Sequence, residues 1–274
     1  MAPLHKWLTI PNGIPEPVPA RHRDAVRQEF GISPRDILLF THGRLVPEKG
    51  LEEVLHAARL LKTRLHAPMT LVLAGEGRLR PALEALARRL ELGDRVRFLG
   101  FRSDIADLLA ASDIVVLPSW REGMSIALLE AMALGKPLIV TSIGSNCEVT
   151  RKGYTACLVP PGDPDAIADA VVRLSKDPEH AAELARNARA VYENEYTLTN
   201  MLAGYHQMYL RLFAERGIPV NTIAPAVLEK HLLSSSLIAF DGQLRTAGGQ
   251  VLPTGAEPAR PRSQQSAIKE KSLA

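Results

Sequence analysis

The sequence predicts an α/β protein: a doubly wound parallel sheet in a single Rossmann-like domain of about six strands, followed by C-terminal helices and a flexible tail. Short apolar runs alternate with longer helical patterns from Ile37 to Val159. Parallel strands joined by helices require right-handed crossovers, which cover both faces of the sheet. Amphipathic helical patterns follow the last apolar run, and no internal repeat is present.

The elements follow in a regular order. We expect strands at residues 37–41, 69–74, 95–99, 114–117, 137–141 and 156–159. Helices are expected between them at residues 51–65, 80–90, 105–111 and 125–134. Three closing helices are expected at residues 164–175, 179–193 and 198–216. Asp163 and Thr197 have the side chains of N-caps for the first and last of these.

The two ends of the chain differ from this pattern. Residues 1–30 are predicted to form a linker-like segment, because prolines and turn signals dominate its first part. Residues 31–216 are the predicted Rossmann-like domain. Residues 217–274 are predicted to be a largely disordered tail, since they offer too little apolar surface to offset the entropy of ordering. Within that tail, residues 227–240 are a candidate short docking helix.

Charge and cysteine content exclude several classes of partner. The formal net charge is only +3, so we predict no nucleic-acid partner. Cys147 and Cys157 lack the CxxC spacing of metal or redox sites, which indicates packing residues kept reduced in the cytosol. No run approaches the roughly 20 apolar residues of a membrane span. We therefore predict a cytoplasmic protein whose membrane contact is at most peripheral.

A first candidate binding loop follows the strand predicted at residues 37–41. Gly43 and Gly50 flank it, and Arg44 and Lys49 place two cations five residues apart. A guanidinium fork and an ammonium suit a diphosphate, whose charge grows as the bond to a sugar breaks. The ordinary alternative is a solvated basic loop before a helix.

A second candidate loop follows the strand predicted at residues 114–117. Glu122 stands at the strand exit and Glu130 eight residues later, inside a helix. Both can accept hydrogen bonds from sugar hydroxyls, and the unpaired amides of the first helical turn can face anionic oxygens. These amides belong to Gly123, Met124, Ser125 and Ile126. The alternative roles are a carboxylate that favours the helix dipole and a surface residue on the polar face.

Other motifs carry less information. Residues 73–77 contain two glycines but lack the GxGxxG fingerprint of a dinucleotide site. Phe101 can offer a ring face to a nucleobase or pack the core. Asp163-Pro-Asp165 is interpreted as a helix cap and not as a metal motif. The eight histidines show no paired metal-ligand spacing, so we predict no metal site and no cofactor.

Four motifs occur in a fixed order, at residues 43–50, 96–100, 122–130 and 158–163. Together they resemble the C-terminal, donor-binding half of retaining family 4 glycosyltransferases of GT-B fold. The resemblance covers about Ile10 to Phe213. The family's Glu-x7-Glu motif falls on Glu122 and Glu130.

The resemblance implies a role for each loop. Arg44 and Lys49 would bind the diphosphate of a UDP- or GDP-sugar, Glu122 the transferred sugar and Glu130 the ribose. The loop near Phe101 would contact the base. Members of the family generally need no metal. Ser125, Ala156 and Cys147 depart from residues common in the family, which bears on donor choice more than on fold.

Such enzymes also have an N-terminal domain that binds the acceptor, and Met1 falls almost at the interdomain linker. We therefore expect a hexosyltransferase of polysaccharide or glycoconjugate biosynthesis, active only with a separate N-terminal domain or subunit. The alternatives are a non-catalytic nucleotide-sugar-binding module, a truncated remnant, and a GT-B-type sugar-nucleotide epimerase.

Overall fold

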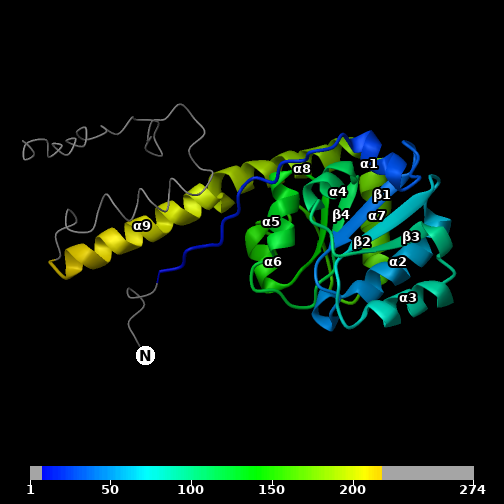
Figure 1. The fold of residues 1–274 in the computed structure, drawn as a ribbon, viewed down its shortest axis with the longest axis horizontal. Coiled ribbons are helices and arrows are strands. Elements are labelled where there is room, and N and C mark those ends of the chain that lie inside the picture. The colour runs from blue at the N-terminus through cyan, green and yellow to red at the C-terminus, as the bar shows by residue number, and fades with distance from the viewer. Residues whose placement is uncertain (1–7, 218–274) are drawn as a thin grey trace, which may run out of the picture. The chain divides into compact units, whose positions relative to one another are not determined.

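The computed structural model describes residues 8–217 and confirms the predicted α/β class. Its sheet has six strands in the order β3-β2-β1-β4-β5-β6, and every neighbouring pair is parallel (Figure 1). The strands are β1 (Ile37–His42), β2 (Met69–Ala74), β3 (Val96–Gly100), β4 (Ile114–Leu117), β5 (Leu138–Thr141) and β6 (Cys157–Val159). Each of the six predicted strands is present; the bounds of β2 and β4 are as predicted, and those of the other strands differ by one residue.

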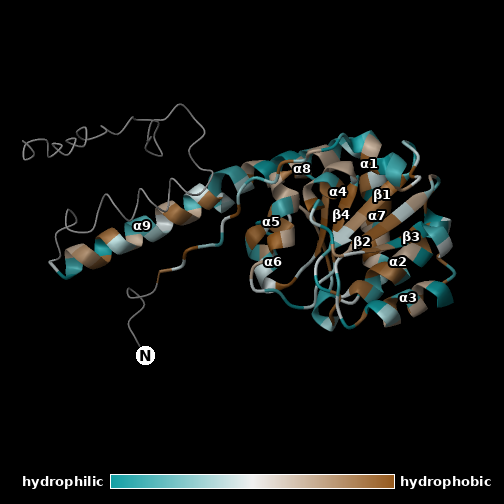
Figure 2. Cartoon of the chain, in the orientation of Figure 1, coloured by the Kyte–Doolittle hydropathy of each residue, from teal (hydrophilic) through white to brown (hydrophobic). Residues whose placement is uncertain are grey.

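The core lies on both faces of the sheet, because successive strand residues point to opposite sides. In β1, Leu39 packs into one cluster of buried residues, while Leu38 and Phe40 pack into the other. Figure 2 shows strongly hydrophobic strands between helices with hydrophilic outer faces. The first cluster is covered by α2 (Leu51–Arg64), α3 (Arg80–Arg89) and α7 (Pro164–Lys176). The second is covered by α1 (Arg23–Glu29), α4 (Ile105–Ala111) and α5 (Ile126–Ala133).

The closing helices follow β6 as predicted. After α7 come α8 (Pro178–Val191), a π-helical turn (Tyr192–Tyr196) and α9 (Leu198–Glu215). The Asp163 carboxylate accepts a hydrogen bond from Ala166 N at 2.9 Å, and Thr197 Oγ1 accepts one from Asn200 N at 3.1 Å. Both predicted N-caps are therefore confirmed, and Asp163-Pro-Asp165 has the structural role expected of it.

Helices α1 and α6 (Gly144–Val149) were not predicted from the sequence. Arg27, on α1, is 2% exposed and donates to Asp113 at 3.1 Å and to the carbonyls of Ser33 and Asp36 at 2.7 and 2.6 Å. Tertiary contacts thus stabilise α1, which at seven residues is too short to be stable alone. Local periodicity could not reveal a contact to a residue 86 positions away.

The chain divides into two compact units, residues 1–209 and residues 210–274. Of the second unit the structure describes residues 210–217, where Arg211 pairs with Glu215 at 3.0 Å on the last turn of α9. Residues 1–7, residues 218–274 of the predicted tail and the candidate helix at 227–240 lie outside the described residues. Between residues 8 and 217, no helix has the length and apolar character to cross a bilayer.

Candidate functional site

The site lies where the strand order reverses. From β1 the chain continues to β2 on one side, while β4 lies on the other side and leads to β5. In open α/β sheets the loops diverge at such a point and leave a crevice at the carboxyl ends of the strands. The loops after β1 and β4 carry Arg44, Lys49 and Glu122, and both meet at this crevice.

A hollow opens in this crevice, and we call it the β1–β4 hollow. Five of the predicted site residues line it, namely Gly43, Arg44, Lys49, Glu122 and Ser125. The other lining residues are Thr41, His42, Leu45, Leu51, Leu73, Ala74, Leu117, Pro118, Ser119 and Ala127. One wall is thus basic, the opposite wall carries a carboxylate and hydroxyls, and apolar side chains form much of the rest.

Glycines bring the loops close together. Gly50 has a left-handed φ of +60°, and a Cβ there would lie 2.0 Å from the carbonyl oxygen of Pro118 in the β4 loop. A Cβ on Gly75, which follows β2, would lie 1.9 Å from the carbonyl oxygen of Gly43. Leu45 N also donates to Glu76 O at 2.9 Å. The glycines at 75 and 77 therefore allow close backbone packing behind the Arg44 loop.

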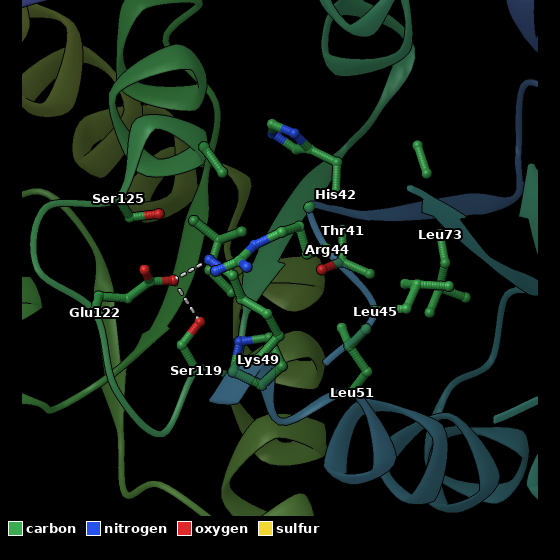
Figure 3. A pocket seen from close by; sticks show the side chains of 15 residues that line it. Thr41, His42, Arg44, Leu45, Lys49, Leu51, Leu73, Ser119, Glu122 and Ser125 are labelled. Atoms are coloured by element: carbon green, nitrogen blue, oxygen red, sulfur yellow. Dashed lines mark hydrogen bonds and ion pairs between the residues drawn. The ribbon is translucent and has the colours of Figure 1, made fainter. Parts of the chain in front are cut away.

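Lys49 and Glu122 form the central contact of the hollow. Lys49 Nζ donates to Glu122 Oε1 at 2.5 Å, and Ser119 Oγ donates to the same oxygen at 2.8 Å (Figure 3). The Glu122 side chain is 12% exposed and that of Lys49 20%. Arg44 is exposed, and Figure 3 shows its side chain extending toward the Glu122 loop. Two cations and a carboxylate therefore meet across the crevice.

Hydroxyl groups hold the Glu122 loop. Ser145 Oγ donates to the carbonyl oxygen of Glu122 at 3.1 Å, and Thr141 Oγ1 donates to that of Ser119 at 2.5 Å. Ser119, Thr141 and Ser145 were not predicted from the sequence. Thr141 ends β5 and Ser145 lies on α6, so a parallel sheet brings both to the same edge as Glu122. A rule that selects polar residues from the last residue of each strand to the first turn of the next helix would have found them.

The start of α5 forms part of the same wall. Ser125 is buried and acts as the N-cap, accepting a hydrogen bond from Leu128 N at 3.4 Å. The amides at the beginning of the helix have no intrahelical partner and lie at its positive end. Gly123 and Ile126 are exposed, and Met124 packs partly against the core. These three residues do not line the hollow itself.

Glu130 contacts a residue that the sequence analysis did not select. Its Oε2 lies 3.7 Å from Nε2 of His42, the last residue of β1. The His42 side chain is 7% exposed and stacks on Phe40, with the ring centroids 5.3 Å apart. Burial, and then the charge of Lys49, lower the pKa of His42 to about 4, so the ring is neutral at pH 7. Burial raises the pKa of Glu130.

Among the predicted site residues, Phe101 is the one at the edge of the sheet, away from the loops after β1 and β4. It follows β3, the edge strand, and its side chain is 80% exposed. It does not line the β1–β4 hollow. Within residues 8–217, no group of His, Cys, Asp and Glu is arranged to hold a metal ion. Cys147 and Cys157 are both free thiols.

The chain is similar to known glycosyltransferases along most of its described length. The family model for glycosyl transferases group 1 matches residues 22–191. The alpha-D-kanosaminyltransferase of Streptomyces kanamyceticus is 36% identical over 190 residues, which are 68% of this chain and 49% of that protein. The N-acetyl-alpha-D-glucosaminyl L-malate synthase of Bacillus anthracis is 32% identical over 69% of this chain and 49% of its own length. The chain thus spans about half the length of these relatives.

Solved structures of glycosyltransferases have the same fold as this chain. Anabaena HepE in complex with UDP superposes with a TM-score of 0.62 at 27% identity, over 70% of this chain and 52% of HepE. The C-terminal domain of LpcC, a group 1 glycosyl transferase from Francisella tularensis, superposes with a TM-score of 0.59 at 28% identity. That match covers 67% of this chain and 97% of the domain. The fold is the Rossmann-like fold of GT-B glycosyltransferases, and the chain belongs to the glycosyl transferases group 1 family.

Proposed function

We propose that this chain is the donor-binding half of a retaining family 4 glycosyltransferase. It would bind a UDP- or GDP-hexose and transfer the sugar to an acceptor, with retention at the anomeric carbon. The observation that carries the proposal is the meeting of Arg44, Lys49 and Glu122 at the switch point of the sheet, with Lys49 Nζ 2.5 Å from Glu122 Oε1. That arrangement offers cations to a diphosphate and an acceptor to sugar hydroxyls.

Arg44 and Lys49 would act on the leaving group. As the bond between the anomeric carbon and the phosphate oxygen breaks, its electron pair moves to the nucleoside diphosphate. A guanidinium and an ammonium already in place stabilise that growing charge without reorganising solvent. Gly43, with a φ of +137°, would let the backbone approach the phosphates closely.

Glu122 would bind the hexose. Its carboxylate already accepts hydrogen bonds from Lys49 and Ser119, and a carboxylate can accept bonds at about four lone-pair sites. Sugar hydroxyls can therefore be added without displacing both partners. The amides of Gly123, Met124, Ser125 and Ile126 would face phosphate or sugar oxygens at the positive end of α5.

Glu130 would bind the ribose hydroxyls, and the loop containing Phe101 would contact the base. UDP is the donor nucleotide favoured by the comparisons, because HepE was solved with UDP and also with UDP-glucose. We infer no cofactor and no metal requirement, because two cations can balance the diphosphate. Two free thiols are typical of a cytoplasmic location, and membrane contact would be at most peripheral.

Transfer would require an acceptor-binding N-terminal domain or a separate subunit that supplies it. The supporting observation is length: the chain covers 97% of an isolated LpcC C-terminal domain but about half of whole relatives. The same observation favours a second candidate, a non-catalytic nucleotide-sugar-binding module. Both functions need nucleotide binding, and only the first needs turnover.

Two experiments separate these candidates. Calorimetry with UDP, GDP and ADP tests for binding, and no heat with any of them at millimolar concentration contradicts both functions. A coupled assay for nucleoside diphosphate release, with UDP-glucose and an added N-terminal glycosyltransferase domain, then tests for transfer. Binding without release in any combination would favour the non-catalytic module. Binding of UDP over GDP, followed by release, is the expected result.

A further inference from the structure

We infer that His42 is a positioning residue for the donor ribose: its imidazole Nε2–H holds the Glu130 carboxylate in the orientation that accepts the ribose hydroxyls. This inference rests on the proposed function, in which Glu130 binds the ribose. It adds a residue that the two loop motifs do not contain and that acts through Glu130 instead of touching the nucleotide.

The position of His42 Nε2 relative to Glu130 is the first observation that supports this role. His42 Nε2 is buried and has no hydrogen-bond partner among the described residues. A buried polar atom without a partner is costly, so such an atom indicates an interaction still to be completed. Glu130 Oε2 is an acceptor only 3.7 Å away, and a shift of about half an ångström would bring it into hydrogen-bond range.

The surroundings fix the His42 ring. It stacks on Phe40 with an interplanar angle of 14°, and it ends a central strand whose backbone is paired on both sides. The Glu130 side chain, by contrast, is 28% exposed, so it can reach both His42 and a bound ligand. A rigid, buried donor behind a partly exposed carboxylate is the arrangement that orients an acceptor before the ligand arrives.

The charges are consistent with a neutral donor. Lys49 lies near enough to oppose protonation of the ring, and burial opposes it more strongly. A neutral imidazole carries one N–H, for which the Ala127 backbone and the Glu130 carboxylate compete, and donating it to Glu130 adds no buried charge. The Lys49 ammonium pairs with Glu122 and not with Glu130, so that cation does not occupy the Glu130 carboxylate.

The test compares UDP with 2′,3′-dideoxyuridine diphosphate, which lacks the ribose hydroxyls. Calorimetry on the whole chain uses wild type, His42→Leu, His42→Gln and His56→Leu. His56 is exposed on α2 and is the matched control. We expect His42→Leu to weaken UDP roughly fivefold to tenfold, the worth of one hydrogen bond, and to change binding of the dideoxy analogue less than twofold. His42→Gln, which retains an N–H donor, should recover most of the loss, and His56→Leu should change neither.

The other possible results distinguish failure of the proposed function from failure of the positioning role. If wild type binds neither nucleotide, the proposed function fails. If wild type prefers UDP to the analogue but His42→Leu weakens both equally or neither, the positioning role is overturned while the donor site stands. Should His42→Leu fail to fold, long-range ¹H–¹⁵N correlation on the wild-type chain reads the tautomer directly. A proton on Nε2 is expected, and a proton on Nδ1 alone would refute the inference.

Discussion

Replacing Lys49 by methionine tests the diphosphate contact most directly. Methionine keeps much of the length and apolar character of the lysine stem, so the loop between Gly43 and Gly50 can keep its packing. The substitution removes the ammonium that bonds to Glu122 at 2.5 Å. Two effects follow, one on nucleotide affinity and one on stability, and the structure sets the size of each.

For affinity, a charge-assisted hydrogen bond to a phosphate contributes about 1.5–3 kcal/mol. In wild type the Lys49 ammonium must be shared with Glu122, which offsets part of this gain. We therefore expect the lower half of the range, about 1.5–2 kcal/mol, which is a loss of roughly 10- to 30-fold in UDP affinity. For stability, the Glu122 carboxylate, 12% exposed, keeps Ser119 but loses its charged partner. That loss should lower the free energy of unfolding by about 1–3 kcal/mol.

Calorimetry with UDP and urea unfolding measure the two effects. Lys176→Met, at the exposed C-terminal end of α7, is the matched control and should change neither. In the double variant Lys49→Met/Glu122→Gln, much of the lost stability should return, because no unpaired carboxylate remains. A Lys49→Met chain that binds UDP within twofold of wild type would show that Lys49 does not contact the diphosphate.

Four further outcomes follow from the same geometry. Glu122→Gln should leave UDP affinity within about threefold but weaken UDP-glucose by about tenfold or more, measured by competition, because Glu122 faces the sugar. Gly50→Ala should lower the free energy of unfolding by about 1–3 kcal/mol or more, since a Cβ would lie 2.0 Å from Pro118 O at a φ of +60°; urea unfolding checks this. The pKa of His42 is near 4 in the folded chain and about 6.5 unfolded, so the unfolded state binds the proton first as pH falls. The contribution of His42 to the free energy of unfolding should therefore be complete above pH 6.5 and decrease by about 3 kcal/mol as the pH falls to 4. In His42→Leu this pH-dependent decrease should be absent. EDTA should leave UDP binding unchanged in calorimetry, and a loss of binding would contradict the metal-independent site.

The strands and most helices could be predicted because their signal is local. The apolar run Ile114–Leu117 between polar residues has the length of a buried strand, and all four of its residues are buried. The site loops could be predicted for a related reason: parallel topology sends every strand's carboxyl end to one edge. The sequence therefore predicts that Arg44, Lys49 and Glu122 meet, and Lys49 and Glu122 are in contact in the structure.

The remaining features depend on long-range contacts that periodicity does not contain. Helix α1 is stabilised by Arg27, whose acceptor Asp113 lies 86 positions later. His42 was not selected from the sequence, because its contact is with Glu130, a residue of another element. Phe101 shows the opposite limit: an aromatic residue after a strand could equally have packed the core, and only the structure shows that its ring is exposed.

Donor binding and sugar transfer should be separable in this chain. The contacts that order the candidate donor site all join residues between Phe40 and Ser145, within the first compact unit. The Lys49–Glu122 pair joins the loop after β1 to the loop after β4, so this chain's own side chains hold the two loops together. An acceptor surface, in contrast, has to face Glu122 from across the crevice. Under the proposed function, nucleotide affinity should therefore be measurable with this chain alone, whereas turnover should require an added acceptor-binding domain.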